Sequence, residues 1–238
     1  MIYTFYHYTK CESVLSILSS QKIWFRMIDS FNDPFEFSFY SDSDLARKIK
    51  NDLKENCAVF CLSEISDNIL MHSHYSDKHR GVVIEFKFNS NDVSNNTKIH
   101  AQILSENDND DGGYSDSLFN ADDFMDRGKD RYFNGDDSYK EKFYQKIARN
   151  IVNTKSKKDW NYEKEVRFTL IGEKPEPNND YIPKSLKECG LTISSIYFGC
   201  KTLQSDENKI KNIVEQQNIK TSKFFRDKKE FKLVKLDG

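Results

Sequence analysis

The stretch DWNYEKEVRF (residues 159–168) places two carboxylates, Glu163 and Glu165, two positions apart in a run that is otherwise rich in apolar and aromatic residues. If this run is a β-strand, its side chains alternate between two faces, so Glu163, Glu165 and Arg167 share one face. The apolar residues from Val166 onward then mark the core face. The polar face is either a solvated sheet surface or the wall of a site.

Length and charge limit the class of protein. The chain has 238 residues, of which 37% are hydrophobic and 13% aromatic, enough for a substantial core. Its 36 basic and 38 acidic residues give a formal net charge of -2, so no global field draws the protein toward nucleic acid or an anionic membrane. Two short basic runs, KSKKDW and RDKKEFK, are typical of solvated loops, although they could guide an RNA acceptor.

The cysteine pattern favours a reducing, cytoplasmic location. The five cysteines are odd in number and form no CxxC pair. The N-terminal sequence lacks a basic region followed by an apolar run and a cleavage site, and no stretch approaches the roughly 18 to 20 apolar residues of a membrane span. We therefore expect neither membrane insertion nor a membrane partner.

Strands and helices interleave without a regular βαβ rhythm or an internal repeat, so the sequence predicts a single α+β domain over residues 1–238, with a mixed, mostly antiparallel sheet flanked by helices. Predicted strands cover residues 2–9, 23–25, 58–64, 81–88, 159–168 and 192–199, and a hairpin turns near 226–229. Predicted helices cover residues 43–56, 67–77, 139–154, 182–190 and 206–218, with Ser43 as an N-cap, and a further helix before the strand at 23–25 is predicted from the helical spacing of Val14, Leu15 and Leu18.

The segment 105–137 is rich in Asp, Asn and Gly without a clear period, which indicates a long acidic loop or lid insertion. It resembles a calcium loop only superficially, because position twelve is Leu118 rather than the bidentate glutamate of an EF-hand. The histidines of MHSHYSDKH also argue against a metal. His72 and His74 are two positions apart on an expected helix and so point to different sides. The sequence therefore predicts no metal site.

Each candidate side chain also has an ordinary structural interpretation. The two glutamates could be surface acids facing Lys or Arg on a neighbouring strand. Trp160 just before the pair favours a site, since an aromatic ring beside a buried carboxylate can raise its pKa or shape a slot for a flat ring. His7 in an aromatic strand is more often a hydrogen-bonded core histidine, and Cys61 is more often a packed thiol than a nucleophile.

Five motifs in order resemble those of a bacterial family of uncharacterised domains, and that family in turn resembles the ADP-ribosyltransferase fold of the His-Tyr-Glu type. The motifs are YHYT, FNDPFE, VFCLSE, MHSHYSDKHRGVVIEF and WNYEKEVRF. The resemblance implies a split β-sheet and NAD as co-substrate. It also implies a role as a toxin-like or phage-defence effector.

The same resemblance assigns roles to individual residues. His7, with Thr9 beside it, would hydrogen-bond the adenine-side ribose of NAD, and Tyr75 would stack on the nicotinamide. Glu165 would bind the ribose hydroxyl on the nicotinamide side, and Glu163 would orient or deprotonate the acceptor.

Further positions would contact NAD. Asn32 and Asp33 lie in the expected donor-binding loop, Ser63 ends a strand, and Trp160 precedes the acidic pair. The chain departs from the transferase pattern at Tyr8, where glycine is common, and either His72 or His74 could replace Tyr75 as the stacking group.

The chemistry suits these residue types, because breaking the nicotinamide–ribose bond builds positive charge that a fixed carboxylate stabilises. The sequence thus favours an NAD-dependent ADP-ribosyltransferase or an NAD glycohydrolase, with a protein or nucleic acid as possible acceptor. One alternative is a non-catalytic nucleotide- or protein-binding sensor module on the same fold. Another is a nucleic-acid-directed enzyme.

Overall fold

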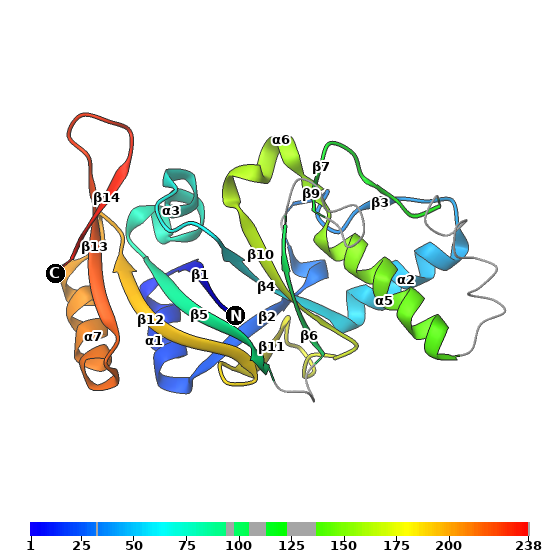
Figure 1. Cartoon of the computed structure of the whole chain (residues 1–238), viewed down its shortest axis with the longest axis horizontal. Helices are drawn as coiled ribbons and strands as arrows, with labels where there is room; N and C mark the ends of the chain where they lie inside the picture. Colours follow the sequence, from blue (N-terminus) through cyan, green and yellow to red (C-terminus); the bar gives the residue numbers. More distant parts are fainter. Residues whose placement is uncertain (32, 94–97, 105–112, 123–136, 238) are drawn as a thin grey trace. The chain divides into compact units, whose positions relative to one another are not determined.

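The computed structural model describes residues 1–31, 33–93, 98–104, 113–122 and 137–237, and it has a mixed α+β fold with mostly antiparallel sheet pairing (Figure 1). The chain divides into two compact units, which we describe separately. Unit 1 contains residues 1–23, 61–97 and 183–238, and unit 2 contains residues 24–60 and 98–182. The single domain expected from the sequence stays a prediction. No helix in the described part of the chain is long and apolar enough to cross a lipid bilayer.

Unit 1 is built on a sheet whose strands follow the order β1, β5, β12, β13, β14. Only the β12–β13 pair among these neighbours is parallel. The strands are β1 (Ile2–Thr9), β5 (Val82–Val93), β12 (Cys189–Phe198), β13 (Lys220–Arg226) and β14 (Leu233–Asp237). The helices are α1 (Cys11–Ser20), α3 (Ile69–Tyr75) and α7 (Gln204–Val214), with the 3-10 turns η2 (Asp77–His79) and η4 (Glu215–Gln217).

The helices of unit 1 cover both faces of this sheet. On α3, His72 packs edge-on against Tyr8 and Phe224, and Phe224 contacts Tyr197. On α7, Lys211 lies over the ring of Phe198. Because Tyr197 and Phe198 are consecutive on β12, they point to opposite faces, so α3 and α7 lie on opposite sides of the sheet. The sequence patterns correctly predicted the two helices α3 and α7 and the strand β12 in these parts of the chain.

A tight turn joins α3 to β5. Asp77, Lys78 and His79 adopt left-handed φ angles of 43°, 54° and 69°, a conformation that costs energy for residues with a Cβ atom. Only glycine fits two positions further along the chain, at Gly81, because a Cβ there would lie 2.2 Å from the carbonyl oxygen of Thr9. Gly199 donates its N–H to the carbonyl of Gly81 (3.0 Å). These contacts hold the strained turn against the ends of β1 and β12.

Unit 2 places strand β10 (Glu165–Ile171) between β4 (Cys57–Ser63) and β6 (Ile99–Ile103). The unit boundaries fall inside β2 (Lys22–Met27), β4 and β11 (Tyr181–Ser185). Helices α2 (Asp44–Asn56) and α5 (Asp137–Asn153) contact each other and β10. Shorter elements are η1 (Ile28–Ser30), β3 (Phe39–Tyr40), β7 (Tyr114–Ser115), β8 (Phe119–Asn120), β9 (Lys155–Ser156), α6 (Lys157–Trp160) and η3 (Asn161–Glu163).

The structure differs from two predictions made from the sequence. The helix predicted at 182–190 is wrong, since this segment continues β11 and then turns, with the N–H and hydroxyl of Ser185 bound to the Glu188 carboxylate (2.8 and 2.6 Å). Pro183 suits a strand at the end of the sheet, where β11 pairs with β2 alone among the strands that the structure describes. In the predicted acidic loop, the described residues 113–122 contain β7 and β8, while residues 105–112 and 123–136 lie outside the described residues.

Candidate functional site

Unit 2 holds a buried group of charged side chains, which we call the charged cluster. The side chains are 0% exposed for Arg167, 4% for Glu163 and Glu165, 6% for Glu36 and 7% for Lys155. Burying charges is costly unless they are paired and hydrogen-bonded. Three carboxylates and two cations therefore share one water-poor space.

Arg167 forms the centre of the charged cluster. Its Nε donates to Oε1 of Glu165 and its Nη2 to Oε2, both at 3.0 Å. This two-point geometry matches the planar guanidinium to a carboxylate. Nη2 also pairs with Glu36, and Nη1 donates to the carbonyl of Val152 in the last turn of α5. Helix-end carbonyls lack intrahelical donors, so Arg167 satisfies one of them.

Lys155 bridges the remaining carboxylates. Its Nζ lies 2.5 Å from Oε2 of Glu163, 2.9 Å from Oε2 of Glu165 and 3.9 Å from Oε2 of Glu36. The same ammonium lies 4.9 Å from the ring centroid of Trp160. Oε2 of Glu165 thus accepts from two cations at once.

The two glutamates reach Lys155 by different routes, which corrects the prediction of one strand through residues 159–168. Glu163 ends the 3-10 turn η3, and β10 begins only at Glu165. Lys164 between them has a left-handed φ of 45°. This residue reverses the chain direction locally, so both carboxylates turn toward the same ammonium. Glu165 and Arg167 do share a strand face, as predicted, but that face is buried rather than solvated.

The electrostatics fix Glu165 in its ionised form. Burial alone would raise its pKa, but the charges of Arg167 and Lys155 and their hydrogen bonds lower the pKa of Glu165 to about 2. Burial would lower the pKa of Lys155, and the neighbouring carboxylates, Glu165 foremost, raise it above its usual value. At neutral pH, Glu165 is therefore an anion that can stabilise positive charge but is a weak general base.

The loop of FNDPFE delivers Glu36 to the charged cluster. Oδ1 of Asp33 accepts the N–H of Phe35 (2.9 Å), and the carbonyl of Asp33 accepts the N–H of Glu36 (3.1 Å). Asp33 thereby shapes the turn that presents Glu36 to Arg167. Asn32, the other residue predicted here, lies outside the described residues.

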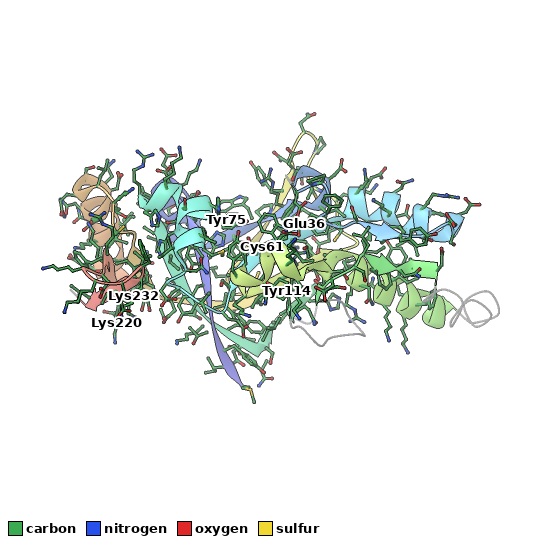
Figure 2. The ribbon with its side chains drawn as sticks, turned by 90° about the horizontal axis from the view of Figure 1, so that it is seen from above. Glu36, Cys61, Tyr75, Tyr114, Lys220 and Lys232 are labelled. Atoms are coloured by element: carbon green, nitrogen blue, oxygen red, sulfur yellow. The ribbon has the colours of Figure 1, made fainter. Side chains whose placement is uncertain are left out.

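Three members of this site were missed from the sequence: Glu36, Lys155 and Tyr114 (Glu36 and Tyr114 are labelled in Figure 2). Strand β7 pairs in parallel with β9, opposite Lys155, and the Tyr114 hydroxyl accepts the backbone N–H of Glu165 at 2.8 Å. Burial raises the pKa of Tyr114. Only the nearness of Lys155 to the acidic pair in the sequence could have indicated its role. Trp160, which was predicted, lies half-buried beside Lys155.

Four predicted residues lie in unit 1. Nδ1 of His7 donates to the carbonyl of Cys61 (3.0 Å), and burial lowers the pKa of His7 to about 4, so its imidazole is neutral. Ser63 is buried, and its Oγ accepts the N–H of Ile65. Thr9 is buried at the end of β1. Tyr75 ends α3 and is 41% exposed.

The histidines of α3 have different surroundings. His72 is fully buried, and its Nε2 donates to the carbonyl of Ser66 (3.1 Å). Its ring stacks on that of His79, with centroids 5.8 Å apart. His72 therefore cannot replace Tyr75 as a stacking group, whereas His74 is exposed beside Tyr75. Within the described ranges, no three His, Cys, Asp or Glu side chains are grouped to hold a metal.

A second polar group, also missed from the sequence, lies on the α3 face of the unit 1 sheet. The Glu85 carboxylate accepts from the Ser194 and Tyr197 hydroxyls, both at 2.5 Å. Burial opposes ionisation of Glu85, but these hydrogen bonds and Lys87 lower its pKa overall. Lys235 lies over the Tyr197 ring, 4.4 Å from its centroid.

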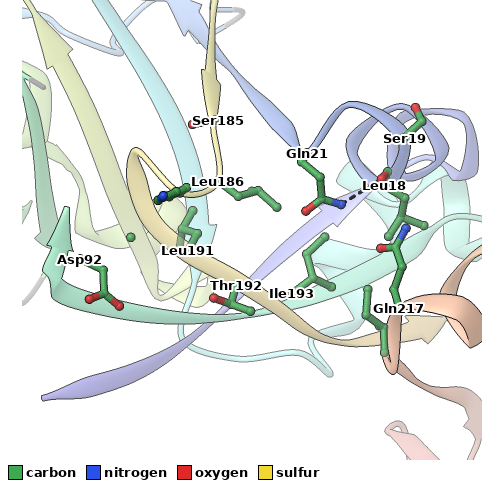
Figure 3. Close-up of a pocket in the computed structure, with 13 residues that line it drawn as sticks. Leu18, Ser19, Gln21, Asp92, Ser185, Leu186, Leu191, Thr192, Ile193 and Gln217 are labelled. Carbon is green, nitrogen blue, oxygen red and sulfur yellow. Dashed lines mark hydrogen bonds between the residues drawn. The ribbon is translucent and has the colours of Figure 1, made fainter. Parts of the chain in front are cut away.

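Unit 1 also has an open groove with a volume of about 900 Å³ (Figure 3). The end of α1, the β11–β12 connection and the segment after α7 line it with both apolar and polar side chains, including Leu18, Gln21, Leu191 and Gln217. No predicted site residue lines this groove.

Comparison with known proteins gives one match. No curated protein and no solved structure matches the chain. The segment that does match a family model is residues 71–168, which contains Tyr75, Glu163 and Glu165 but not His7 or Glu36. Residues 71–168 match the family model described as "Protein of unknown function (DUF2971)", so this segment is similar to that uncharacterised family.

Proposed function

We propose that this protein is an NAD-dependent ADP-ribosyltransferase or NAD glycohydrolase, acting as a toxin-like or phage-defence effector. The observation that carries the proposal is the fixed, ionised carboxylate of Glu165 at the start of β10, which accepts hydrogen bonds from Nε and Nη2 of Arg167. The five motifs resemble those of a bacterial family of uncharacterised domains, and the resemblance of that family to His-Tyr-Glu transferases supplies the reaction class.

The reaction breaks the bond between C1′ of the ribose and the nicotinamide nitrogen, and nicotinamide leaves with the electron pair. Positive charge develops on the ribose, and a carboxylate fixed in a water-poor environment stabilises it without reorganising. Water or an acceptor hydroxyl then bonds to C1′ and loses a proton. Glu165 suits the first task, because its low pKa keeps it charged.

The residues of unit 1 have properties that suit NAD. His7 is neutral, and because Nδ1 donates to Cys61, the lone pair lies on Nε2, which can accept a ribose hydroxyl. The partly exposed ring of Tyr75 offers a stacking surface for nicotinamide.

The proposal makes a specific demand on Lys155. Both oxygens of Glu165 already accept hydrogen bonds, Oε1 from Arg167 and Oε2 from Arg167 and Lys155. A ribose hydroxyl that binds Oε2, which already accepts two hydrogen bonds, must therefore take the place of Lys155. Glu163, which binds the same ammonium at 2.5 Å, can retain Lys155 when it moves.

The test is nicotinamide release from NAD by the wild-type protein and by Glu165→Gln, with cell extract or RNA supplied as acceptor. Glu55→Gln is the matched control, because Glu55 is an exposed carboxylate in the same unit. We expect release by the wild type and the control and none by Glu165→Gln. Absence of both release and NAD binding in the wild type would overturn the proposal.

The complete pairing of Glu165 favours a second candidate, a non-catalytic module that binds a nucleotide or a protein on the same fold. A glutamate whose side chain is 4% exposed and bound by two cations is also what a structural ion cluster requires. NAD binding by calorimetry without nicotinamide release under any condition would support this candidate over the enzyme.

A further inference from the structure

Strands β13 and β14 form a hairpin with a strong local charge, which we call the basic hairpin (residues 220–237). Its seven lysines and arginines outnumber its three acidic residues, although the whole chain has a formal net charge of -2. Figure 1 shows the hairpin loop extending beyond the neighbouring helices of unit 1, and Figure 2 labels Lys220 and Lys232 on it.

Most of these cations are available for an external partner. Lys220, Arg226, Lys228 and Lys229 are exposed, and none of the four forms an ion pair within the part of the chain that the structure describes. Lys232 pairs with Glu230 at 2.8 Å on the surface. Such exposed pairs are weak and exchange readily with other anions.

Aromatic and aliphatic side chains lie among the cations. Phe231 in the loop is 101% exposed, Phe225 on β13 is 43% exposed and Leu236 on β14 is 54% exposed. Neither phenylalanine ring contacts another aromatic ring of the described chain. The register sets Phe225 opposite Val234 and Lys223 opposite Leu236, so Phe225 and Leu236 share one face of the hairpin.

The loop that carries Phe231 is ordered by its own hydrogen bonds. Oδ1 of Asp227 accepts the N–H groups of Lys229 (2.7 Å) and Glu230 (2.9 Å), and the N–H of Asp227 donates to the carbonyl of Lys232 (3.0 Å). An ordered loop loses little conformational entropy when it binds.

From these observations we propose that the basic hairpin binds single-stranded nucleic acid. The unpaired cations are complementary to phosphates, and the open faces of Phe231 and Phe225 are complementary to unstacked bases. An anionic membrane suits the hairpin less well, because membrane insertion requires contiguous apolar surface and here lysines separate the apolar side chains. This inference does not depend on cleavage of NAD.

The experiment measures fluorescence anisotropy of labelled single-stranded RNA and DNA of about a dozen nucleotides, titrated with the full-length protein at several salt concentrations without NAD. We expect Phe231→Ala to weaken binding by roughly fivefold or more, through loss of base stacking. The double variant Lys228→Glu, Lys229→Glu should weaken binding further and reduce the salt slope by about 1.4, since each phosphate contact to a single strand contributes about 0.7.

The matched control is the double variant Lys48→Glu, Lys209→Glu, which changes the net charge equally at exposed positions on α2 and α7. Circular dichroism checks that every variant folds. Failure of the wild type to bind at low salt, or equal loss in the control and hairpin variants, overturns the inference. Tighter, Phe231-dependent binding to phosphatidylserine vesicles than to either oligonucleotide also overturns it, in favour of a membrane surface.

Discussion

Arg167 binds Glu165 through two hydrogen bonds of 3.0 Å, although a single residue separates them on strand β10. The pairing depends on the extended backbone, because only strand alternation brings positions i and i+2 onto one face. Since both side chains are buried, the charged cluster forms together with the core of unit 2.

Replacing Arg167 by methionine should lower the free energy of unfolding by about 3–5 kcal/mol, because Glu36 and Glu165 would lose their buried counter-ion. Urea denaturation measures this loss. Lys174→Met is the control, since Lys174 pairs with Glu55 on the surface, with exposures of 67% and 71%, and should change stability by less than about 1 kcal/mol. Equal losses in the two variants would contradict a buried ion cluster.

Lys155→Met should destabilise the protein by roughly 3 kcal/mol, because Glu163 and Glu165 would lose the ammonium that lies between them. Adding Glu163→Gln removes one of the two facing charges and should restore part of that loss. A double-mutant cycle measured by urea denaturation should give a coupling energy of about 1–3 kcal/mol. Additive effects would show that the two side chains do not interact.

Stability should fall as the pH drops from about 6.5 to 4. Burial lowers the pKa of His72 and of His7 to about 4, so below 6.5 the unfolded chain binds protons that the folded chain does not. Each histidine contributes about 3 kcal/mol to this loss. Glu165 adds to it only below its ordinary pKa of 4.5, since its lowered pKa stabilises the fold above that value.

The variant His72→Leu isolates this effect, and denaturant unfolding between pH 7 and pH 4.5 measures it. Its stability should depend less steeply on pH than that of the wild type, with His7 providing the remaining slope. The control is His74→Leu, which replaces an exposed histidine on the same helix. Identical slopes in all three proteins would argue that His72 is protonated in the folded state.

Gly81→Ala should cost at least roughly 3 kcal/mol, because the new Cβ would lie 2.2 Å from the Thr9 carbonyl oxygen, which is backbone and cannot move aside. Gly172→Ala is a useful comparison. Gly172 has a φ of +83° but meets only the flexible end of Lys98, so we expect a cost of about 1–2 kcal/mol. Thermal unfolding compares the stability losses of the two variants. A larger loss in Gly172→Ala than in Gly81→Ala would contradict the close contact between Gly81 and Thr9.

The periodicity of apolar and polar residues predicted the helices and strands whose side-chain pattern follows from neighbouring positions in the sequence. The interval of four between Phe143, Ile147 and Ile151 predicted α5, and all three side chains are buried. Alternation likewise predicted that Glu165 and Arg167 share a face. The helix expected at 182–190 was wrong, because pairing with β2 overrides its weak helical pattern.

The charged cluster depended on contacts that periodicity does not encode. Glu36 and Arg167 are 131 positions apart, and Tyr114 reaches the N–H of Glu165 from 51 positions away. The left-handed Lys164, which separates Glu163 from the strand, has no glycine or asparagine to indicate it. The sequence could therefore identify the acidic pair and the arginine on the same face, but not Glu36, Lys155 or Tyr114.

The division of the chain restricts which fragments can fold. Unit 1 combines three separated stretches of sequence and unit 2 combines two, so no continuous piece consists of one unit alone. The family match at 71–168 takes part of each and omits both β1 and β12, the neighbours of β5 in the sheet. Expressed alone, that segment would expose both edges of β5 and should aggregate. The polypeptide must also be synthesised through β14 before unit 1 can close, which favours slow folding governed by distant contacts.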